Sequence, residues 1–207
     1  MGSRNQKKIV RSISKYKSGV VSRKQKHEEF ERHLAANLFV EAKYPIHEAV
    51  YSAGLFESGI GHVLLSRVVN TRKVAFGAFL LDVYCLGAKN AFFREEPFTR
   101  YDEIRQHLFE NDPMIETTPP FVRKLVEDGV KYAKSIGFQP HKDYQIAKQI
   151  FGDIDSGSCT VDFTFGQDGK PFFVSGPNDT PQRCREIYEI LERNCGSGNF
   201  DYMISTG

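Results

Sequence analysis

The stretch HVLLSRVVNTRKVAFGAFLLDVY, residues 62–84, decides the fold of this chain. Its runs of branched and aromatic residues at 62–69 and 74–84 predict two strands, and the polar residues 70–73 predict a short hairpin connection between them. In the second run apolar residues occupy both alternating faces, which is typical of a central strand covered on both sides. With a further strand predicted at 47–52, this part of the chain indicates a β-meander.

Helices are expected after the meander. Residues 85–93 are predicted to form a short helical segment, and Thr99 with Asp102 resembles a capping box that opens a second helix. The clearest helix follows Pro119-Pro120, because apolar residues recur there at spacings of three and four. Its predicted buried stripe is Val122, Leu125, Val126, Gly129, Val130 and Ala133. A further helix is expected over 142–151.

The C-terminal part returns to strands and then to a helix. Residues 161–165 and 172–174 flank Gln167-Asp168-Gly169-Lys170, in which the Asp-Gly pair favours a tight hairpin. Pro181, with Asp179 or Thr180 as the cap before it, predicts a helix start. The expected buried stripe of that helix is Cys184, Ile187, Tyr188 and Leu191. The residues from Gly196 onward are predicted to be a loosely attached tail.

These patterns predict an α+β fold. Its mixed or antiparallel sheet would combine the β-meander and the C-terminal hairpin, packed with several helices. We expect a basic N-terminal helical arm at 1–40 and a single α+β domain at 41–207. Within the arm, helices are expected over 9–16 and 22–39. A chain of 207 residues is long enough to bury a core without disulfides.

Cysteine usage and hydropathy indicate a cytoplasmic protein. No two cysteines form a C-x-x-C pair, so a zinc ribbon or a thioredoxin motif is not predicted. We interpret all four as reduced thiols of the cytosol: Cys85, Cys159, Cys184 and Cys195. No stretch approaches the roughly 20 apolar residues that span a bilayer, and no apolar core follows the basic N-terminus as in a signal peptide. We therefore expect no membrane partner.

Charge is distributed very unevenly along the chain. The formal net charge is only +2, but residues 1–27 carry nine lysines and arginines and no acidic residue. The remaining residues carry a net charge of −7. Clustered cations bind phosphate backbones through counterion release, so the arm predicts contact with RNA or DNA. The residues expected to make it are Arg4, Lys7, Lys8, Arg11, Lys15, Lys17, Arg23 and Lys24. A solvated tail or a helix docked on the acidic body is the alternative.

Several segments resemble an uncharacterised family of bacterial conserved hypothetical proteins. The resemblance covers roughly residues 45–202. It is carried by residues 82–90 (DVYCLGAKN), 137–143 (GFQPHKD), 165–171 (FGQDGKP), 176–179 (GPND) and 198–202 (GNFDY). The family has no known activity, so the resemblance implies no reaction. It does imply that the body is one unit and that the basic arm is a separable addition.

Cys85 is the candidate for chemistry. It is predicted to lie where a buried strand meets a helix start, and a helix N-terminus lowers a thiol's pKa. A nucleophilic cysteine also needs a nearby histidine. The candidates are His47, His62 and His141, with Asp82 or Glu48 as the orienting group. The alternatives are that Cys85 is a small buried hydrophobic residue and that Asp82 accepts backbone N–H groups at a strand end.

The remaining motifs predict no cofactor and no metal site. His141-Lys142-Asp143 and Asp153-Ile154-Asp155 lack the further ligands of a metal or calcium-loop signature. Gly59-Ile60-Gly61 precedes a strand rather than a helix, so it is interpreted as a turn. Residues 176–179 precede a helix, where free N–H groups could cradle a phosphate, although a turn and cap is the more frequent arrangement.

The leading hypothesis is a non-enzymatic accessory protein associated with nucleic acid. Its arm would bind RNA or DNA, alone or within a ribonucleoprotein complex such as a ribosome. The acidic body would contact a protein partner. Two alternatives stay open: a small cysteine-dependent enzyme with Cys85 as nucleophile and Asp82 and His62 as its helpers, and a protein-interaction module.

Overall fold

The structure, a computed structural model, describes residues 44–204. The arm expected at 1–40 and its two predicted helices lie outside the described residues. The described part of the segment 41–207 contains a five-stranded sheet and a separate two-stranded sheet. These sheets combine with helices, which confirms the α+β class.

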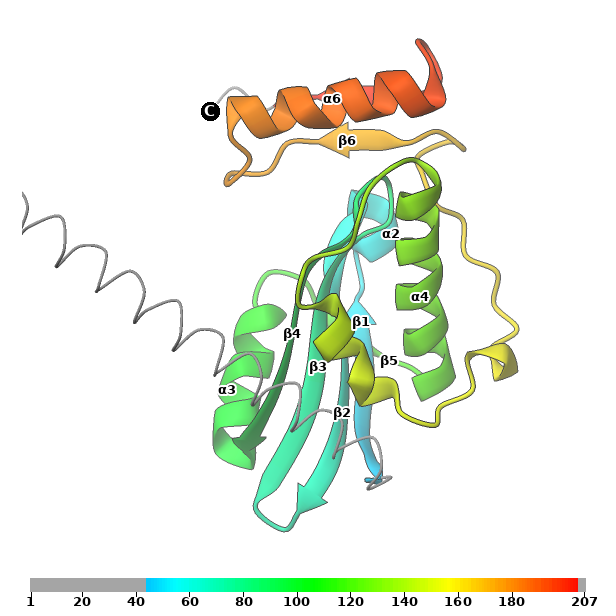
Figure 1. Cartoon of the computed structure of the whole chain (residues 1–207). Coiled ribbons are helices and arrows are strands. Elements are labelled where there is room, and N and C mark those ends of the chain that lie inside the picture. The colour runs from blue at the N-terminus through cyan, green and yellow to red at the C-terminus, as the bar shows by residue number, and fades with distance from the viewer. Residues whose placement is uncertain (1–43, 205–207) are drawn as a thin grey trace, which may run out of the picture.

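The larger sheet is antiparallel throughout, with the strand order β4-β3-β2-β1-β5 (Figure 1). Its strands are β1 (Ile46–Ser52), β2 (Ile60–Asn70), β3 (Lys73–Asp82), β4 (Gly87–Pro97) and β5 (Met114–Glu116). Consecutive strands β1 to β4 are neighbours in the sheet, so the predicted β-meander is confirmed. β3 lies inside the sheet between β2 and β4, as its two apolar faces predict.

Helices cover both faces of this sheet, and β2 shows how the sequence brings this about. Val63 and Leu65 belong to the core cluster that includes α4 (Pro119–Ser135), whereas Leu64 belongs to the cluster that includes α3 (Phe98–Leu108). Successive side chains of a strand point to opposite faces. An unbroken apolar run therefore supplies both interfaces of the sheet.

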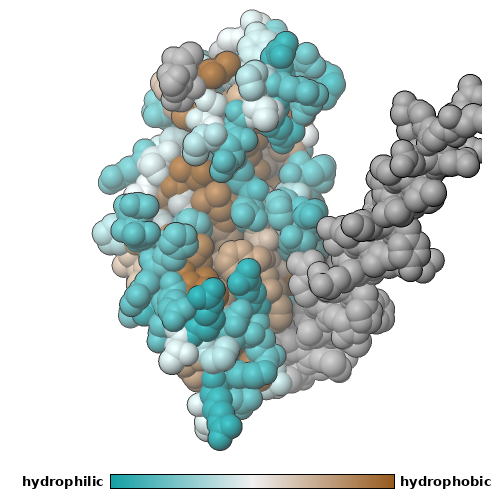
Figure 2. Space-filling model, turned by 90° about the vertical axis from the view of Figure 1, so that its left-hand side faces the viewer, coloured by the Kyte–Doolittle hydropathy of each residue, from teal (hydrophilic) through white to brown (hydrophobic). Residues whose placement is uncertain are grey.

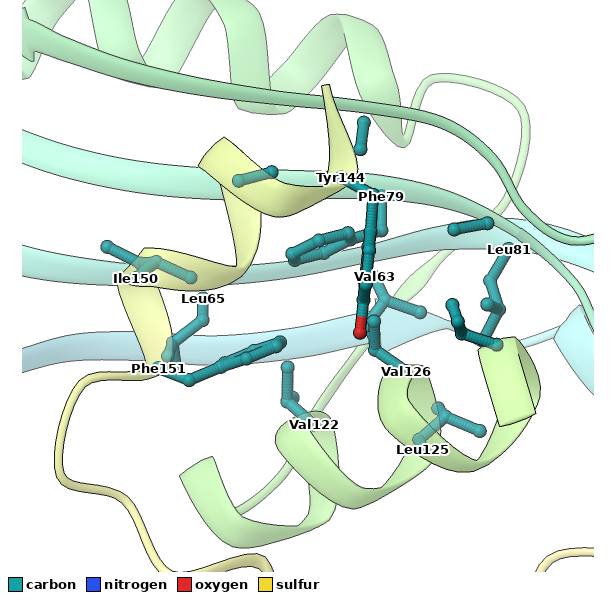
Figure 3. Close-up of a cluster of buried hydrophobic side chains, with 14 of the residues drawn as sticks. Val63, Leu65, Phe79, Leu81, Val122, Leu125, Val126, Tyr144, Ile150 and Phe151 are labelled. Atoms are coloured by element: carbon teal, nitrogen blue, oxygen red, sulfur yellow. The ribbon is translucent and has the colours of Figure 1, made fainter. Parts of the chain in front are cut away.

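The main core lies between the sheet and α4, together with α5 (Tyr144–Ala147) and the short 3-10 helix η1 (Lys148–Phe151). Figure 3 shows labelled side chains of α4 and η1 converging on those of β2 and β3. The predicted stripe of α4 is buried in full. Each large apolar side chain buried in this way contributes about 1.5–3 kcal/mol. The helix expected over 142–151 is present as α5 followed directly by η1.

The segment 87–93 is a correction to the sequence prediction, because it is strand and not helix. A four-residue turn reverses the chain after Asp82, and Gly87 leaves that turn with φ +65°, a conformation that side-chain-bearing residues rarely adopt. The reversal pairs Asp82 with Gly87 and Leu81 with Ala88. Pairing with β3 thus decides the structure of this segment, although its own apolar pattern is ambiguous.

The C-terminal part also differs from the prediction. The turn at Gln167–Lys170 is present, with the Gln167 N–H donating to the Lys170 carbonyl at 2.8 Å, but residues 161–165 form no strand. Phe165 instead stacks on Tyr132 of α4, with ring centroids 5.4 Å apart. Packing against α4 thus takes these residues away from any sheet.

The supposed tail is part of a small β-α-β unit. β6 (Phe172–Val174) pairs in parallel with β7 (Asp201–Met203), and α6 (Pro181–Cys195) connects them. Figure 1 shows α6 lying over β6 at one end of the larger sheet. The prediction of one shared sheet is therefore wrong, because within residues 44–204 the C-terminal strands pair with each other and not with the larger sheet. Tyr188, expected in the buried stripe of α6, is 43% exposed.

One of the two predicted helix caps is confirmed. The Thr180 hydroxyl accepts a hydrogen bond from the Arg183 N–H at 3.2 Å, and Pro181 occupies the first helical position. The capping box at Thr99 is wrong, because α3 already begins at Phe98 and Pro97 is its cap residue. Along the described chain, no helix combines the length and the apolar character needed to cross a bilayer. Figure 2 shows polar surface broken by apolar patches on the side of β4 and α3.

Candidate functional site

The turn that follows β3 is organised by Asp82. Its Oδ1 atom accepts the backbone N–H of Tyr84 at 3.0 Å and that of Cys85 at 2.8 Å. Burial raises the pKa of the Asp82 carboxyl to about 6, while its backbone hydrogen bonds and Lys89 pull the pKa the other way. The structural role that the sequence offered for Asp82, satisfying N–H groups at a strand end, is confirmed.

Cys85 lies in the same turn and has no exposed surface. It packs in a cluster with Leu86, Phe138, Phe173 and residues of α6. No helix begins at Cys85, so the expected helix N-terminus is absent from this site. Burial, followed by the charge of Asp82, raises the pKa of the Cys85 thiol well above its usual value. A thiol with these properties is a poor nucleophile at neutral pH.

The predicted helper histidines are placed elsewhere. His62 lies on β2 with its ring against Phe109, at a centroid distance of 6.0 Å, and burial lowers its pKa. His47 packs edge-on against Phe98 and Tyr101 near α3. Among the described residues, no hydrogen bond joins Cys85 to any histidine. The structure thus brings Asp82 and Cys85 together but does not add His62 to them.

A cleft of about 540 Å³ lies close to this turn. Five aromatic side chains line it, and they come from parts of the chain that are far apart: Tyr51 of β1, Phe56 of α2 (Leu55–Ser58), Tyr84 of the turn, Phe121 of α4 and Phe163 of the segment along α4. This set of residues is called the aromatic cleft below. Its volume lies within the range of small-ligand sites.

Four rings of the aromatic cleft contact one another in a chain. Tyr51 and Phe121 have centroids 5.1 Å apart, and Phe121 meets Phe163 edge-on at 4.9 Å. Phe56 lies nearly parallel to Phe163, with an interplanar angle of 8° and centroids 6.0 Å apart. Phe56 is 36% exposed, so this wall is open to solvent. Large aromatic rings at an open cleft are typical of a binding surface.

Hydrogen bonds and a glycine hold Tyr84 in place at the edge of the cleft. Its hydroxyl donates to the carbonyls of Phe56 and Glu57 at 2.8 and 3.1 Å. Gly59 has φ +77°, and a Cβ atom there would lie 2.1 Å from Cδ2 of Tyr84. The turn predicted at Gly59-Ile60-Gly61 is present at Gly59, but Ile60 and Gly61 already belong to β2. Gly59 also makes room for the ring.

The polar groups of the aromatic cleft differ from those of the Asp82 turn. No hydrogen bond or ion pair within residues 44–204 involves the side chains of Thr164, Gln167 or Asp168, or the hydroxyl of Tyr51. In the described part of the chain, the carboxylate of Asp162 lies 3.7 Å from Lys124 Nζ. The charged residues that line the cleft are both acidic, Asp162 and Asp168. The cleft therefore offers aromatic faces and hydrogen-bond acceptors to a ligand.

Two other expectations can be placed. The loop at 176–179 is a turn and cap, because the Gly176 N–H donates to the Asp179 carboxylate at 2.8 Å and the Asp179 N–H donates to the Gly176 carbonyl. These N–H groups are therefore not free to cradle a phosphate. Across the described range, no group of three or more His, Cys, Asp or Glu residues is arranged to hold a metal ion.

Sequence reasoning missed the aromatic cleft altogether. Val161, Phe163 and Phe165 alternate in a way that favours a strand, and Tyr51 and Phe121 resemble core residues of a strand and a helix. Nothing in the local sequence separates an aromatic residue in a cleft from one in a core. The eight basic residues of the arm lie outside the described residues, so the structure places none of them.

Comparisons with family models, with curated proteins and with solved structures each find no match to this chain. The resemblance of residues 45–202 to an uncharacterised bacterial family stays a prediction.

Proposed function

We propose that this protein is a non-enzymatic, nucleic-acid-associated protein. Its basic arm binds the phosphate backbone of RNA or DNA, and its acidic body contacts a protein partner. The observation that carries the proposal is the separation of charge along the chain. Nine basic residues and no acidic residue lie in 1–27, whereas residues 44–204 have a formal net charge of −5. An arm of this kind attracts polyanions, and a body of this kind repels them.

Ion pairing in the body supports this division of roles. Arg67, Arg105 and Arg123 are held by Asp153, Glu48 and Glu127 respectively. The same arrangement occurs at exposed positions, where Lys73 faces Glu95 at 2.9 Å. A lysine or arginine already paired with a carboxylate gains less from a phosphate. The arm is therefore the stronger source of phosphate affinity.

The chemistry around Cys85 favours a non-enzymatic role over the alternative of a cysteine-dependent enzyme. A nucleophilic cysteine needs thiolate character, access and a base. Cys85 is fully buried, its pKa is raised, and the hydrogen bonds of the described residues link it to no histidine. Its backbone N–H is used to stabilise the turn. These features are those of a packing residue.

The test is the salt dependence of nucleic-acid binding. The full chain is titrated against a fluorescent single-stranded RNA and a DNA duplex at several salt concentrations. Each phosphate contact contributes about −0.7 (single strand) or about −0.9 (duplex) to the slope of log K against log salt. We expect a slope of several units that collapses when the eight named arm residues are changed to glutamine, or when residues 1–26 are deleted.

A matched control neutralises two cations of the body, Lys73 and Arg100, which are exposed and paired with Glu95 and Glu103. The double substitution Lys73→Gln, Arg100→Gln should leave the slope unchanged. Affinity that survives loss of the arm would sink the proposal. Affinity that falls equally in the control would move the phosphate contacts to the body.

A further inference from the structure

We propose that the aromatic cleft is a binding site for the guanidinium group of an arginine side chain presented by a partner protein. This goes beyond binding of nucleic acid by the arm, because it assigns a ligand chemistry to the body. The two sites involve different residues and opposite charge. Each can therefore fail without the other.

The walls of the cleft suit a flat cation. Phe56 is 36% exposed and stacks nearly parallel on Phe163, with ring centroids 6.0 Å apart, and Tyr51 and Phe121 add two further rings. The electron-rich faces of such rings attract cations, and arginine in particular stacks its planar group on them. Phe163 already has a cation near it: the Lys124 Nζ atom lies 5.1 Å from its centroid. The cleft thus contains a ring that makes this kind of contact within the protein.

The charge at the cleft is acidic and only partly neutralised. Lys124 faces Asp128 at 3.1 Å and Asp162 at 3.7 Å, so one lysine is shared between two carboxylates. Asp168 has no ion-pair partner among residues 44–204. It lies in the left-handed region at φ +51°, in the turn whose N–H and carbonyl groups are bonded between Gln167 and Lys170. This turn holds an unpaired carboxylate at the cleft, where it can accept two hydrogen bonds from one guanidinium.

Three further lining side chains can accept or donate hydrogen bonds, and their polar atoms have no hydrogen-bond partner in the described chain: Tyr51, Thr164 and Gln167. Arginine carries five N–H donors and no acceptor, so it needs an environment rich in acceptors. A nucleotide would bring a phosphate to a rim whose charged lining residues are Asp162 and Asp168. The negative charge of the phosphate and the negative charges of these carboxylates would repel each other and oppose binding. The chemistry of the lining therefore favours the cation over the nucleobase.

The experiment compares two peptides that differ in charge alone. The probes are acetyl-Gly-Ser-Arg-Ser-Gly-amide and the same peptide with citrulline, the neutral isostere of arginine, in place of arginine. Each is titrated into the ¹⁵N-labelled full chain, and amide shifts are followed by NMR. We expect the arginine peptide to shift the amides of 162–168 and the citrulline peptide to bind at least about tenfold more weakly.

Two variants locate the site. Asp168→Asn keeps a residue that tolerates the left-handed conformation, and it should lower the affinity for the arginine peptide about five- to tenfold. Phe56→Ala removes one exposed wall and should weaken it by a similar factor. The matched control is Asp201→Asn, which makes the same charge change at an exposed position on β7 and should leave binding unchanged. The rest of each spectrum reports whether the variant is folded.

Three results would overturn the proposal. Equal affinity for the two peptides would mean that the cleft does not recognise charge. Shifts that are absent, or that are unaffected by Asp168→Asn, would place any binding elsewhere. Larger shifts of the same amides with adenosine monophosphate than with the arginine peptide would make the cleft a nucleobase site.

Discussion

The Asp82 turn and the aromatic cleft share one residue, Tyr84, yet they treat their polar groups in opposite ways. In the turn, the Asp82 carboxylate is buried and accepts two backbone N–H groups. In the cleft, Asp168 and the hydroxyl of Tyr51 have no partner among residues 44–204. Groups that are buried and bonded stabilise a fold, whereas accessible groups without partners are available to a ligand. The difference supports a structural role for the turn and the binding role that we propose for the cleft.

The largest expected effect tests the structural role of the turn. Asp82→Ala removes the acceptor of the Tyr84 and Cys85 N–H groups and leaves both amides without a partner. We expect the free energy of unfolding to fall by about 4 kcal/mol, measured by urea denaturation. Asp82→Asn keeps an acceptor oxygen and should lose much less. Equal losses in the two variants would show that the turn does not depend on these hydrogen bonds.

The second effect is a dependence of stability on pH. Asp82 has a folded-state pKa of about 6, raised from its usual 3.8. The folded state thus binds this proton more tightly than the unfolded state does. Proton binding at Asp82 therefore stabilises the folded state fully below about pH 4. This stabilisation, of up to about 3 kcal/mol, is lost as the pH rises through 6.

The matching measurement is the unfolding free energy of wild type and of Asp82→Asn from pH 4 to pH 7. The stability of wild type relative to the variant should fall across this range. A constant difference would contradict the raised pKa of Asp82.

The third effect is the protection of Cys85. In the native protein a thiol reagent should modify Cys85 more slowly than the half-buried Cys159 by at least about a hundredfold, because labelling of a buried thiol requires opening of the structure. Mass spectrometry of timed samples gives the two rates. A Cys85 that reacts faster than the other cysteines would instead favour the enzyme alternative.

The smallest effect is expected at the cleft. Tyr51→Phe removes a hydroxyl that has no partner in the described part of the chain, so stability should change by less than about 0.5 kcal/mol. The comparison variant is Tyr101→Phe, whose buried hydroxyl donates to Glu48 and contacts Ser66. Tyr101→Phe should lower the free energy of unfolding by about 1–2 kcal/mol. A costly Tyr51→Phe would mean that the cleft is part of the scaffold.

The success of the fold prediction depended on how local each signal is. The buried stripe of α4 is visible in the sequence because one helix face repeats every three to four residues. The helix prediction for residues 87–93 was wrong because these residues fit helix or strand about equally. Their pairing with β3 decided for the strand. A strand was predicted at 172–174, where β6 lies, but no local pattern marks its three-residue partner β7 or the parallel pairing across the 26 residues between them.

The candidate sites divide in the same way. Asp82 and Cys85 are distinctive residue types in a buried run, so the sequence drew attention to them, but burial and the placement of His62 were unknown. The aromatic cleft has no local signature, since β1, α2, α4 and two loops each contribute to it. Five segments that are separate in the chain become one surface only when the core packs.

By itself the sequence determined the α+β class, the β-meander, the helix α4 and the separation of a basic arm from an acidic body. Each of these follows from periodicity or charge within a continuous stretch of chain. The tertiary structure alone decided that β4 is a strand, that the C-terminus forms a β-α-β unit, that Cys85 is buried and that five aromatic rings line one cleft. These features depend on contacts between residues distant in sequence, and such contacts exist only in the folded chain.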